Sequence, residues 1–276
     1  RKLLGVISLK QLILGQEQDQ VDQLMTTDLI SADVDTDQDD VAKTIARYDL
    51  LALPIVDAQG VMVGIVTYDD AMDVASEEAT EDFLRVGAVN ASSKLSLKNA
   101  SIFVLYQKRV FWLVILVFGS LLSDIGIAHF EDIIAANIVL VFFLPLLVGS
   151  GGNAGSQSAT LMVRALATGD VQFKDWFYLL GRESLVALCL GVTMAIAVSV
   201  LGYFRGDAMV ALVLALSMLG IVLLGCLIGM SLPFILNRFK LDPASASAPL
   251  VTSICDATGV IVYLFIASQL LTGIAP

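Results

Sequence analysis

Five apolar stretches constrain the fold of this chain more than any other feature, because each approaches the roughly 20 residues that a helix needs to cross a bilayer. They run over approximately 109–128, 132–152, 183–204, 208–232 and 249–272. Hydrophobic residues make up 57% of the chain, a share typical of membrane proteins. The sequence therefore predicts an α-helical membrane domain with five transmembrane helices over residues 108–276.

Charge divides the chain into two parts. Residues 1–90 hold 18 Asp and Glu against 6 Lys and Arg, a net charge of −12, whereas residues 91–276 hold 9 against 10, a net charge of +1. An acidic soluble part thus precedes the membrane domain. Its negative charge repels nucleic acid, which excludes that class of partner, and attracts cations. Acidic residues also simply keep a domain soluble, so both interpretations stay open.

Basic residues set the expected orientation, because Lys and Arg gather on the cytoplasmic side of a membrane. With the N-terminal part in the cytoplasm, the cytoplasmic flanks hold Lys94, Lys98, Lys108, Arg109, Arg164, Lys174, Arg182, Arg238 and Lys240, and the other side holds Arg205. We expect a protein integral to the plasma (inner) membrane, in contact with lipid, with its C-terminus outside the cytoplasm.

Asp256 is a lone carboxylate inside an apolar run, with no Lys, Arg or His in that run to neutralise it. A charge at this depth costs about 2.5–3.5 kcal/mol or more, so it is kept where it meets a partner, water or an ion. Thr252 and Gly259 share its helical face, and Ala248 continues that face two turns earlier. A narrow polar stripe of this kind suits a pore lining. The alternative is a structural carboxyl that bonds to a neighbouring helix.

A glycine-rich segment ends the second predicted span, from Pro145 to Gln157. Gly149 and Gly152 belong to a set of four glycines that permit close backbone approach, and irregular backbone is tolerated at membrane depth only along a cavity. Asn153 and Gln157 add amide oxygens on one helical face. Tight helix packing by small residues is the structural alternative.

Enzymatic chemistry has little support in the sequence. An intramembrane aspartyl protease needs a second membrane-embedded Asp, and Asp124 lies near the far end of its span without a matching motif. His129 is the single histidine. The three cysteines lie in apolar spans without a CxxC pattern, so they are interpreted as small buried residues. We expect that the protein is not an enzyme.

The soluble part contains an internal repeat. Gly5-Val6-Ile7-Ser8 recurs as Gly64-Ile65-Val66-Thr67, with a helical pattern over 38–51, strands at 53–56 and 61–66, and a renewed helix over 68–75. This α/β pattern resembles the CBS (cystathionine β-synthase) domain pair, with residues 1–12 as the tail of a first unit and 13–75 as a second. Some CBS units hold an adenine nucleotide through a Thr and an Asp three residues later, and Thr67 and Asp70 fit that pattern.

Residues 76–107 are predicted as an acidic connector. Its helix is expected to start at Ser76, where the following carboxylates suit the positive end of a helix. The alternative is that these carboxylates meet other acidic surfaces across a bound divalent cation.

The chain as a whole resembles the MgtE family of magnesium channels. The resemblance rests on the segment from Pro145 to Gln157, continuing to Asp170, and on the DP…P…D..G pattern from Asp242 to Gly259. The family's larger N-terminal domain has no counterpart here, so the sequence is expected to be a fragment or to lack an N-terminal piece.

The resemblance implies a homodimer whose pore lies on the two-fold axis, with Asp256 as the ion-selecting carboxylate and Mg²⁺ as substrate and regulator. By position, Gly149, Gly152, Asn153, Thr252 and Ala248 are candidates for the pore lining. The candidates for Mg²⁺ sensing are Glu77, Glu78, Glu81, Asp82 and Asp242. Some members of the family have an amide where this chain has Ala248.

The leading hypothesis is therefore a gated, Mg²⁺-selective channel. One or two carboxylates suit Mg²⁺, because this ion gives up its water reluctantly and keeps several water ligands when it binds a protein. A cation exchanger coupled to Na⁺ or H⁺ is one alternative, and a CBS-bearing membrane receptor that conducts nothing is another.

Overall fold

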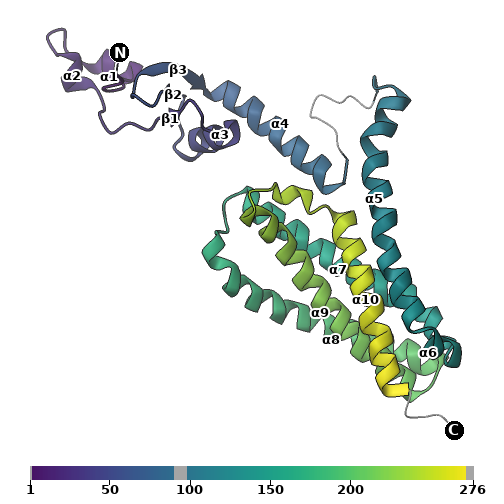
Figure 1. Ribbon diagram of the computed structural model, residues 1–276. Coiled ribbons are helices and arrows are strands. Elements are labelled where there is room, and N and C mark those ends of the chain that lie inside the picture. Colours follow the sequence, from purple (N-terminus) through teal and green to yellow (C-terminus); the bar gives the residue numbers. More distant parts are fainter. Residues whose placement is uncertain (1, 90–97, 272–276) are drawn as a thin grey trace. The chain divides into compact units, whose positions relative to one another are not determined.

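The computed structural model describes residues 2–89 and 98–271 (Figure 1). The chain forms two compact units, Arg1–Glu81 and Asp82–Pro276. The predicted fold class is confirmed, because a small α/β unit is followed by a helical unit in which five helices of the described residues are long and apolar enough to cross a membrane.

The first unit is built around a three-stranded sheet. Its elements are α1 (Leu9–Leu14), α2 (Val21–Leu24), β1 (Ala32–Asp33), α3 (Gln38–Arg47), β2 (Ala52–Val56), β3 (Met62–Thr67) and the start of α4 (Tyr68–Val86). β1 pairs parallel to β2, and β2 pairs antiparallel to β3. A turn between the two predicted strands closes this hairpin, where Gly60 adopts a φ of 73° and the Asp57 carboxylate accepts hydrogen bonds from the backbone N–H groups of Gln59 and Val61.

A small core holds α3 and α4 against the sheet. Val41 and Ile45 of α3 are buried with Leu53 of β2 and Ala71 of α4. The side chain of Asp37 caps α3 by accepting from the backbone N–H of Asp39. The predicted helix and strands of this part are therefore present, with bounds shifted by a few residues.

The acidic helix does not begin where the sequence predicts. Instead of a new start at Ser76, α4 is one helix from Tyr68 to Val86, and the Ser76 carbonyl accepts a hydrogen bond from the Thr80 hydroxyl inside it. No Gly or Pro interrupts these residues, so nothing in the chain favours a break. Part of the predicted connector, residues 90–97, lies outside the described residues.

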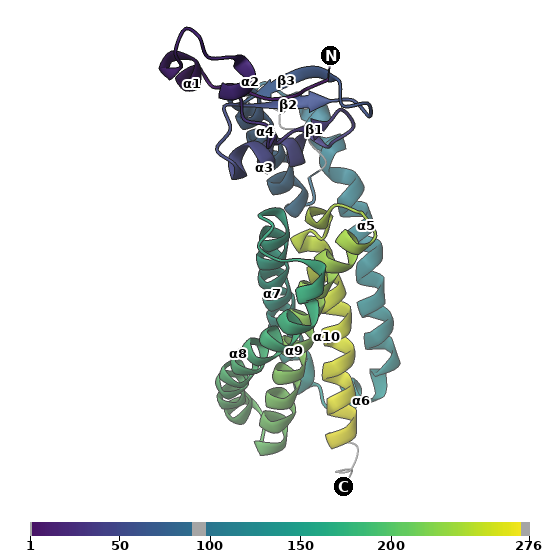
Figure 2. The same cartoon turned by 90° about the vertical axis from the view of Figure 1, so that its left-hand side faces the viewer.

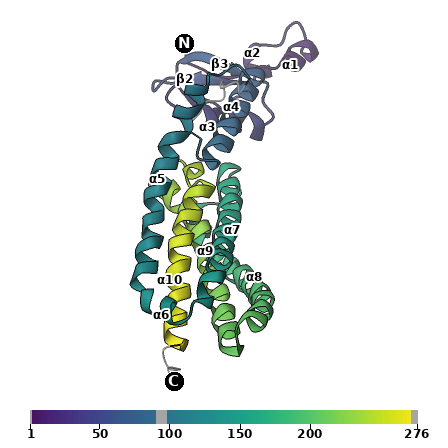
Figure 3. The ribbon, with the colours of Figure 1, turned by 90° about the vertical axis from the view of Figure 1, so that its right-hand side faces the viewer.

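The second unit is a helical bundle. Its elements are α5 (Ile102–His129), α6 (Glu131–Ala136), α7 (Val139–Ala167), η1 (Phe173–Asp175), α8 (Trp176–Arg205), α9 (Ala208–Arg238), η2 (Pro243–Ser245) and α10 (Ala248–Leu271). α9 packs against α7, α8 and α10, and α10 lies between α5 and the pair of α7 and α9 (Figures 2 and 3). The largest buried side chains, such as Leu147, Leu214 and Tyr263, come from α7, α9 and α10.

The second span differs from its prediction over 132–152. Residues 131–136 form the separate short helix α6, and α7 then runs without interruption from Val139 to Ala167. The glycine-rich segment is therefore the middle of a regular helix and not an irregular end. Tertiary packing overrides the weak helix propensity of glycine here, because small residues allow two backbones to approach closely.

That close packing joins α7 to α9. A Cβ atom added to Gly225 would lie 2.6 Å from the Gly151 carbonyl oxygen, and one added to Gly229 would lie 1.9 Å from the Gly155 carbonyl oxygen. Each helix thus presents two glycines, four residues apart, to the other. The interpretation of this segment as a helix-packing surface is therefore correct for Gly151 and Gly155.

Candidate cation site between α7 and α10

The Asp256 carboxylate lies at the contact between α10 and α7. Its Oδ1 atom is fully buried and has no hydrogen-bond partner among the residues that the structure describes, although the side chain as a whole is only partly buried. A buried polar atom without a partner costs free energy, and the cost is greater for a carboxylate. An oxygen in this position is suited to accept a hydrogen bond from water or to face a cation.

Gly152 of α7 stands directly against this carboxylate. A Cβ atom at Gly152 would lie 2.9 Å from Cγ2 of Thr252 and 3.1 Å from Oδ1 of Asp256. The absence of a side chain at this position is therefore what allows the polar stripe of α10 to reach the backbone of α7. Gly259 continues the contact, because its Cβ would lie 3.7 Å from the Cα of Val148.

Ser156 extends the polar contact by one helical turn. Its hydroxyl lies 2.9 Å from the Thr252 hydroxyl and 3.3 Å from the backbone carbonyl of Ala248, to which it donates. Ser156 is not among the site residues predicted from the sequence. Its position four residues after Gly152, on the same helical face, is the signal that points to it.

Gly149 and Asn153 lie on a different part of α7. A Cβ at Gly149 would meet nothing within 4 Å, and the exposed Asn153 lines an open groove of about 640 Å³. The other residues along this groove are Ser156, Gln157, Thr160 and Leu161. Asn153 and Gln157 share one face, as the sequence predicts, and that face is the exposed side of α7.

A second carboxylate within the membrane helices lies on the other side of α7. Ser158 is buried, with 6% of the residue exposed, and its hydroxyl donates to Oε1 of Glu183 on α8 at 2.5 Å. The span predicted over 183–204 begins at Glu183. The helix starts at Trp176 instead, so Glu183 lies two turns inside α8.

The predicted regulatory carboxylates are divided between two settings. Glu77, Glu78, Glu81 and Asp82 lie along one side of α4, at positions one turn apart. Asp242 starts the turn η2, where Oδ1 accepts from the backbone N–H of Ala244 and Oδ2 forms an ion pair with Arg85. Among the described residues, no group of three or more His, Cys, Asp or Glu side chains is arranged to hold a metal ion.

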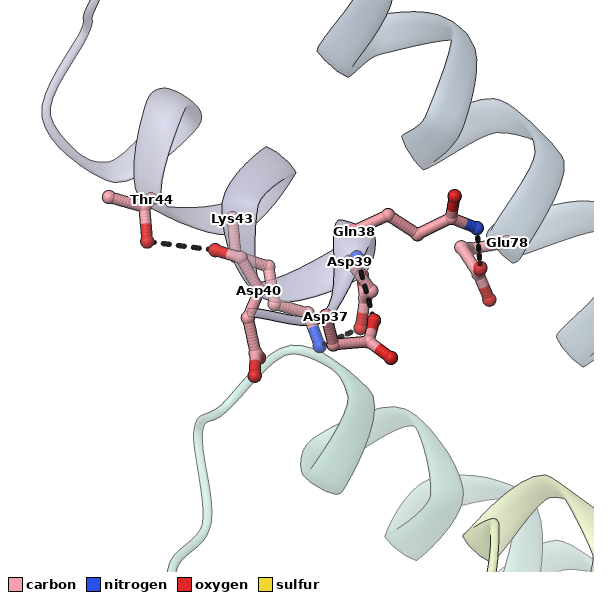
Figure 4. Close-up of polar contacts among 7 residues, drawn as sticks. All are labelled: Asp37, Gln38, Asp39, Asp40, Lys43, Thr44 and Glu78. Atoms are coloured by element: carbon pink, nitrogen blue, oxygen red, sulfur yellow. Dashed lines mark hydrogen bonds and ion pairs between the residues drawn. The ribbon is translucent and has the colours of Figure 1, made fainter. Parts of the chain in front are cut away.

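Within the first unit, an acidic helix start faces α4. Oε1 of Glu78 accepts from Nε2 of Gln38 at 2.8 Å, next to Asp37 and Asp39 at the start of α3 (Figure 4). Lys43 pairs with Asp39, at 2.6 Å between Nζ and Oδ2. Glu78 is therefore held by an uncharged amide from the neighbouring helix.

The candidate nucleotide residues lie at the junction of β3 and α4. The Thr67 hydroxyl donates to Oδ2 of Asp70 at 3.0 Å, so the two side chains are neighbours at the start of the helix. This contact is also what a Thr before a helix makes with an acidic residue in the first turn. The contact between Thr67 and Asp70 is compatible with a local helix cap and equally with a hydroxyl and a carboxylate that bind a ribose.

Two family comparisons match separate parts of the chain. Residues 144–266 match the family MgtE, described as a divalent cation transporter, and residues 21–77 match the CBS domain. The first match covers α7 to α10, including both sides of the Asp256 contact. The second covers α2 to the first half of α4.

Curated relatives extend the similarity along almost the whole chain. The chain is 40% identical over 99% of its length to the "Magnesium transporter MgtE" of Thermus thermophilus and 36% identical over 97% of its length to that of Bacillus subtilis. These alignments cover 60% and 59% of the two relatives, so the chain spans about three fifths of their length.

A solved structure, the cytosolic domain of the Mg²⁺ channel MgtE in complex with ATP, is 44% identical over 26% of this chain and 29% of that one, with a TM-score of 0.26. That likeness is too limited to define the fold.

Proposed function

Residues 144–266 of this chain belong to the MgtE family of divalent cation transporters and residues 21–77 to the CBS domain family, and from that premise we propose that the protein is a Mg²⁺-selective channel. Its membrane helices make it an integral membrane protein. Magnesium is the cargo named for the relatives, and it is the substrate proposed here.

The unpartnered, buried oxygen of Asp256 carries the proposal. This oxygen carries the charge that attracts a cation, and it lies against the backbone of Gly152, a residue that has no side chain to separate the two helices. Mg²⁺ is held through one or two carboxylates while it keeps several waters, and hydroxyl and carbonyl groups serve those waters as partners. Thr252 and Ser156, one turn away, supply such hydroxyls.

A second copy of the chain is proposed to complete the pore. The exposed face of α7 carries Asn153, Gln157 and Thr160 at helical spacing in the middle of an apolar helix, a costly surface to present to lipid. Pairing of two such faces would remove them from lipid and line a water-filled path. It would also bring two Asp256 carboxylates to one divalent ion.

The acidic first part of the chain is proposed to regulate conduction. The net charge of −12 over residues 1–90 and the row of carboxylates on α4 favour binding of divalent cations there. Bound Mg²⁺ would offset repulsion between acidic surfaces and favour the closed state. Adenine nucleotide at Thr67 and Asp70 is a further proposed ligand.

Reconstituted flux tests the substrate and the role of Asp256 together. In liposomes, Asp256→Ala should lower Mg²⁺ flux by about tenfold or more, since even indirect partners of a metal ligand carry such factors. Asp170→Ala, which removes an exposed carboxylate after α7, should leave the flux unchanged. Full flux in Asp256→Ala would contradict the proposal.

The two alternatives give different results in the same liposomes. A coupled exchanger would require an opposing Na⁺ or H⁺ gradient, and its flux would stop when both gradients are abolished. A receptor would give no flux under any condition. Flux of the wild-type chain down a Mg²⁺ gradient alone, without either coupling gradient, is the result expected for a channel.

A further inference from the structure

The Glu183 carboxylate on α8 accepts a hydrogen bond from Ser158 on the long helix α7, and the proposed conduction path does not use it. It is only partly exposed on α8 and faces the buried Ser158 of α7, a setting in which a carboxylate costs more free energy than an aliphatic side chain. A charge kept at this cost calls for a role that an apolar side chain could not fill.

Its partner Ser158 is placed on a particular side of α7. Ser156 and Ser158 are two positions apart, which sets their side chains roughly 160° apart around the helix. The Ser156 hydroxyl bonds to Thr252 on α10, beside the Asp256 contact, and the Ser158 hydroxyl bonds to Glu183 at 2.5 Å on the opposite side.

These two hydrogen bonds restrain the rotation of α7 about its own axis. The contacts of Gly151, Gly152 and Gly155 add no hydrogen bond to this restraint, and the Tyr263 hydroxyl of α10 donates to the Leu140 carbonyl near the start of α7, about four turns before Ser156. Hydrogen bonds are directional and weaken steeply with misalignment, so one on each side defines the rotation of α7 about its own axis.

Glu183 reaches α7 from a helix that is not its main packing neighbour. α7 packs chiefly against α9 and α10, and α8 packs chiefly against α9. The bond from Ser158 to Glu183 therefore spans two helices whose contact would otherwise be slight. A hydrogen bond to a charged acceptor is about twice as strong as one between neutral groups, so this single bond can hold α7 and α8 together at this point.

We propose that Glu183 is a positioning residue: it accepts a hydrogen bond from Ser158, fixes the rotation of α7, and so keeps Gly152 against the Asp256 carboxylate. This inference rests on the proposed Mg²⁺ conduction. It differs from that proposal in assigning a role to a residue outside the path, one that shapes the geometry of the ion site without touching the ion.

Loss of the hydrogen bond between Ser158 and Glu183 should change ion selectivity as well as total flux, because rotation of α7 alters the width of the proposed path beside Asp256. In reconstituted wild-type protein and variants, we expect Ser158→Ala and Glu183→Met to lower the ratio of Mg²⁺ to Ca²⁺ flux about tenfold, which corresponds to 1.4 kcal/mol. We also expect the half-saturating Mg²⁺ concentration to rise. A ratio of two fluxes does not depend on how much protein folds.

Two further variants make the test specific. Glu183→Gln keeps an oxygen that can accept from Ser158, so it should retain most of the wild-type ratio. Ser184→Ala removes the next hydroxyl along α8, which donates to the Leu180 carbonyl of its own helix, and it should leave the ratio unchanged. The double variant Ser158→Ala/Glu183→Met should be no worse than either single variant, because all three lose the same bond.

An unchanged flux ratio and half-saturating concentration in folded Ser158→Ala and Glu183→Met would overturn the inference, as would a Glu183→Gln variant as impaired as Glu183→Met. Failure of the proposed function gives a different pattern. In that case the wild-type protein itself shows no Asp256-dependent Mg²⁺ flux.

Discussion

At the residue scale, Gly152 and Gly149 show how differently two glycines of one segment are used. The Cα of Gly152 faces Thr252 and Asp256 at a distance that leaves no room for a methyl group, whereas Gly149 faces open space. The two glycines are three residues apart on α7, and both lie in regular helix. Of these two residues, only Gly152 is thus required to be glycine by its packing.

The pair provides a matched test of the cation site. Gly152→Ala should lower Mg²⁺ flux markedly, because the added methyl displaces Thr252 or the Asp256 carboxylate, and overpacking of this kind costs about 1–3 kcal/mol. Gly149→Ala should lower flux less than Gly152→Ala, because no atom lies within 4 Å of the added methyl group, and it should gain slightly in stability from alanine's better helix propensity. Equal flux in the two variants, measured in liposomes at matched protein density, would show that Gly152 does not border the path.

At the element scale, the contact between α7 and α9 determines how the bundle is packed. Its two pairs of glycines bring backbone against backbone, and the closest approach is between Gly229 and the Gly155 carbonyl. A carbonyl in a helix cannot move aside as a flexible side chain can. The whole α7–α9 contact must therefore open to admit any side chain at position 229.

Gly229→Ala should consequently destabilise the folded bundle by about 1–3 kcal/mol or more, measured as a lower melting temperature in detergent. Gly220→Ala on the same helix is the control. Its methyl would lie 3.3 Å from Cγ1 of Val262, a side chain that can shift by a small amount. A melting temperature lowered as much by Gly220→Ala as by Gly229→Ala would argue against the α7–α9 contact as the reason.

At the scale of the whole molecule, one chain leaves a polar helix face uncovered. The groove along Asn153, Gln157 and Thr160 is open in a single chain, and the proposed second copy would cover it. The assembly and its regulation are therefore properties that no single helix defines.

Cysteine cross-linking tests this pairing directly. In a Cys189→Ser background, which removes the one exposed native thiol among the described residues, Asn153→Cys should give a disulfide-linked dimer in oxidised membranes, because a two-fold axis along α7 brings identical positions together. Ile196→Cys, exposed on α8, should stay monomeric on the same gel. Dimers through Ile196→Cys and none through Asn153→Cys would place the interface elsewhere.

Regulation is tested at the same scale by removing the acidic part. Deletion of residues 1–90 should raise flux at millimolar Mg²⁺ by about fivefold or more, since couplings between sites commonly reach that size. The comparison is with the full chain at micromolar and millimolar Mg²⁺ on the cytoplasmic side. Inhibition by millimolar Mg²⁺ that persists in the deleted chain would locate the sensor outside these residues.

Much of this protein follows from its sequence because the causes are local. Apolar length determined the membrane helices, apolar runs on either side of a short polar segment determined the hairpin from Ala52 to Thr67, and an isolated charge marked Asp256. Each of these depends on residues close together in the chain, where periodicity and solvation cost operate directly.

Other features were decided only by tertiary structure. Glycines that locally favour a break became the centre of α7, because the free energy gained by packing against α9 outweighs their helix propensity. The partners of Ser156 and Ser158, Thr252 and Glu183, come from other helices, and no spacing along the chain encodes such contacts. The sequence by itself thus determined which residue attracts a cation, and packing decided which backbone and hydroxyl groups stand beside it.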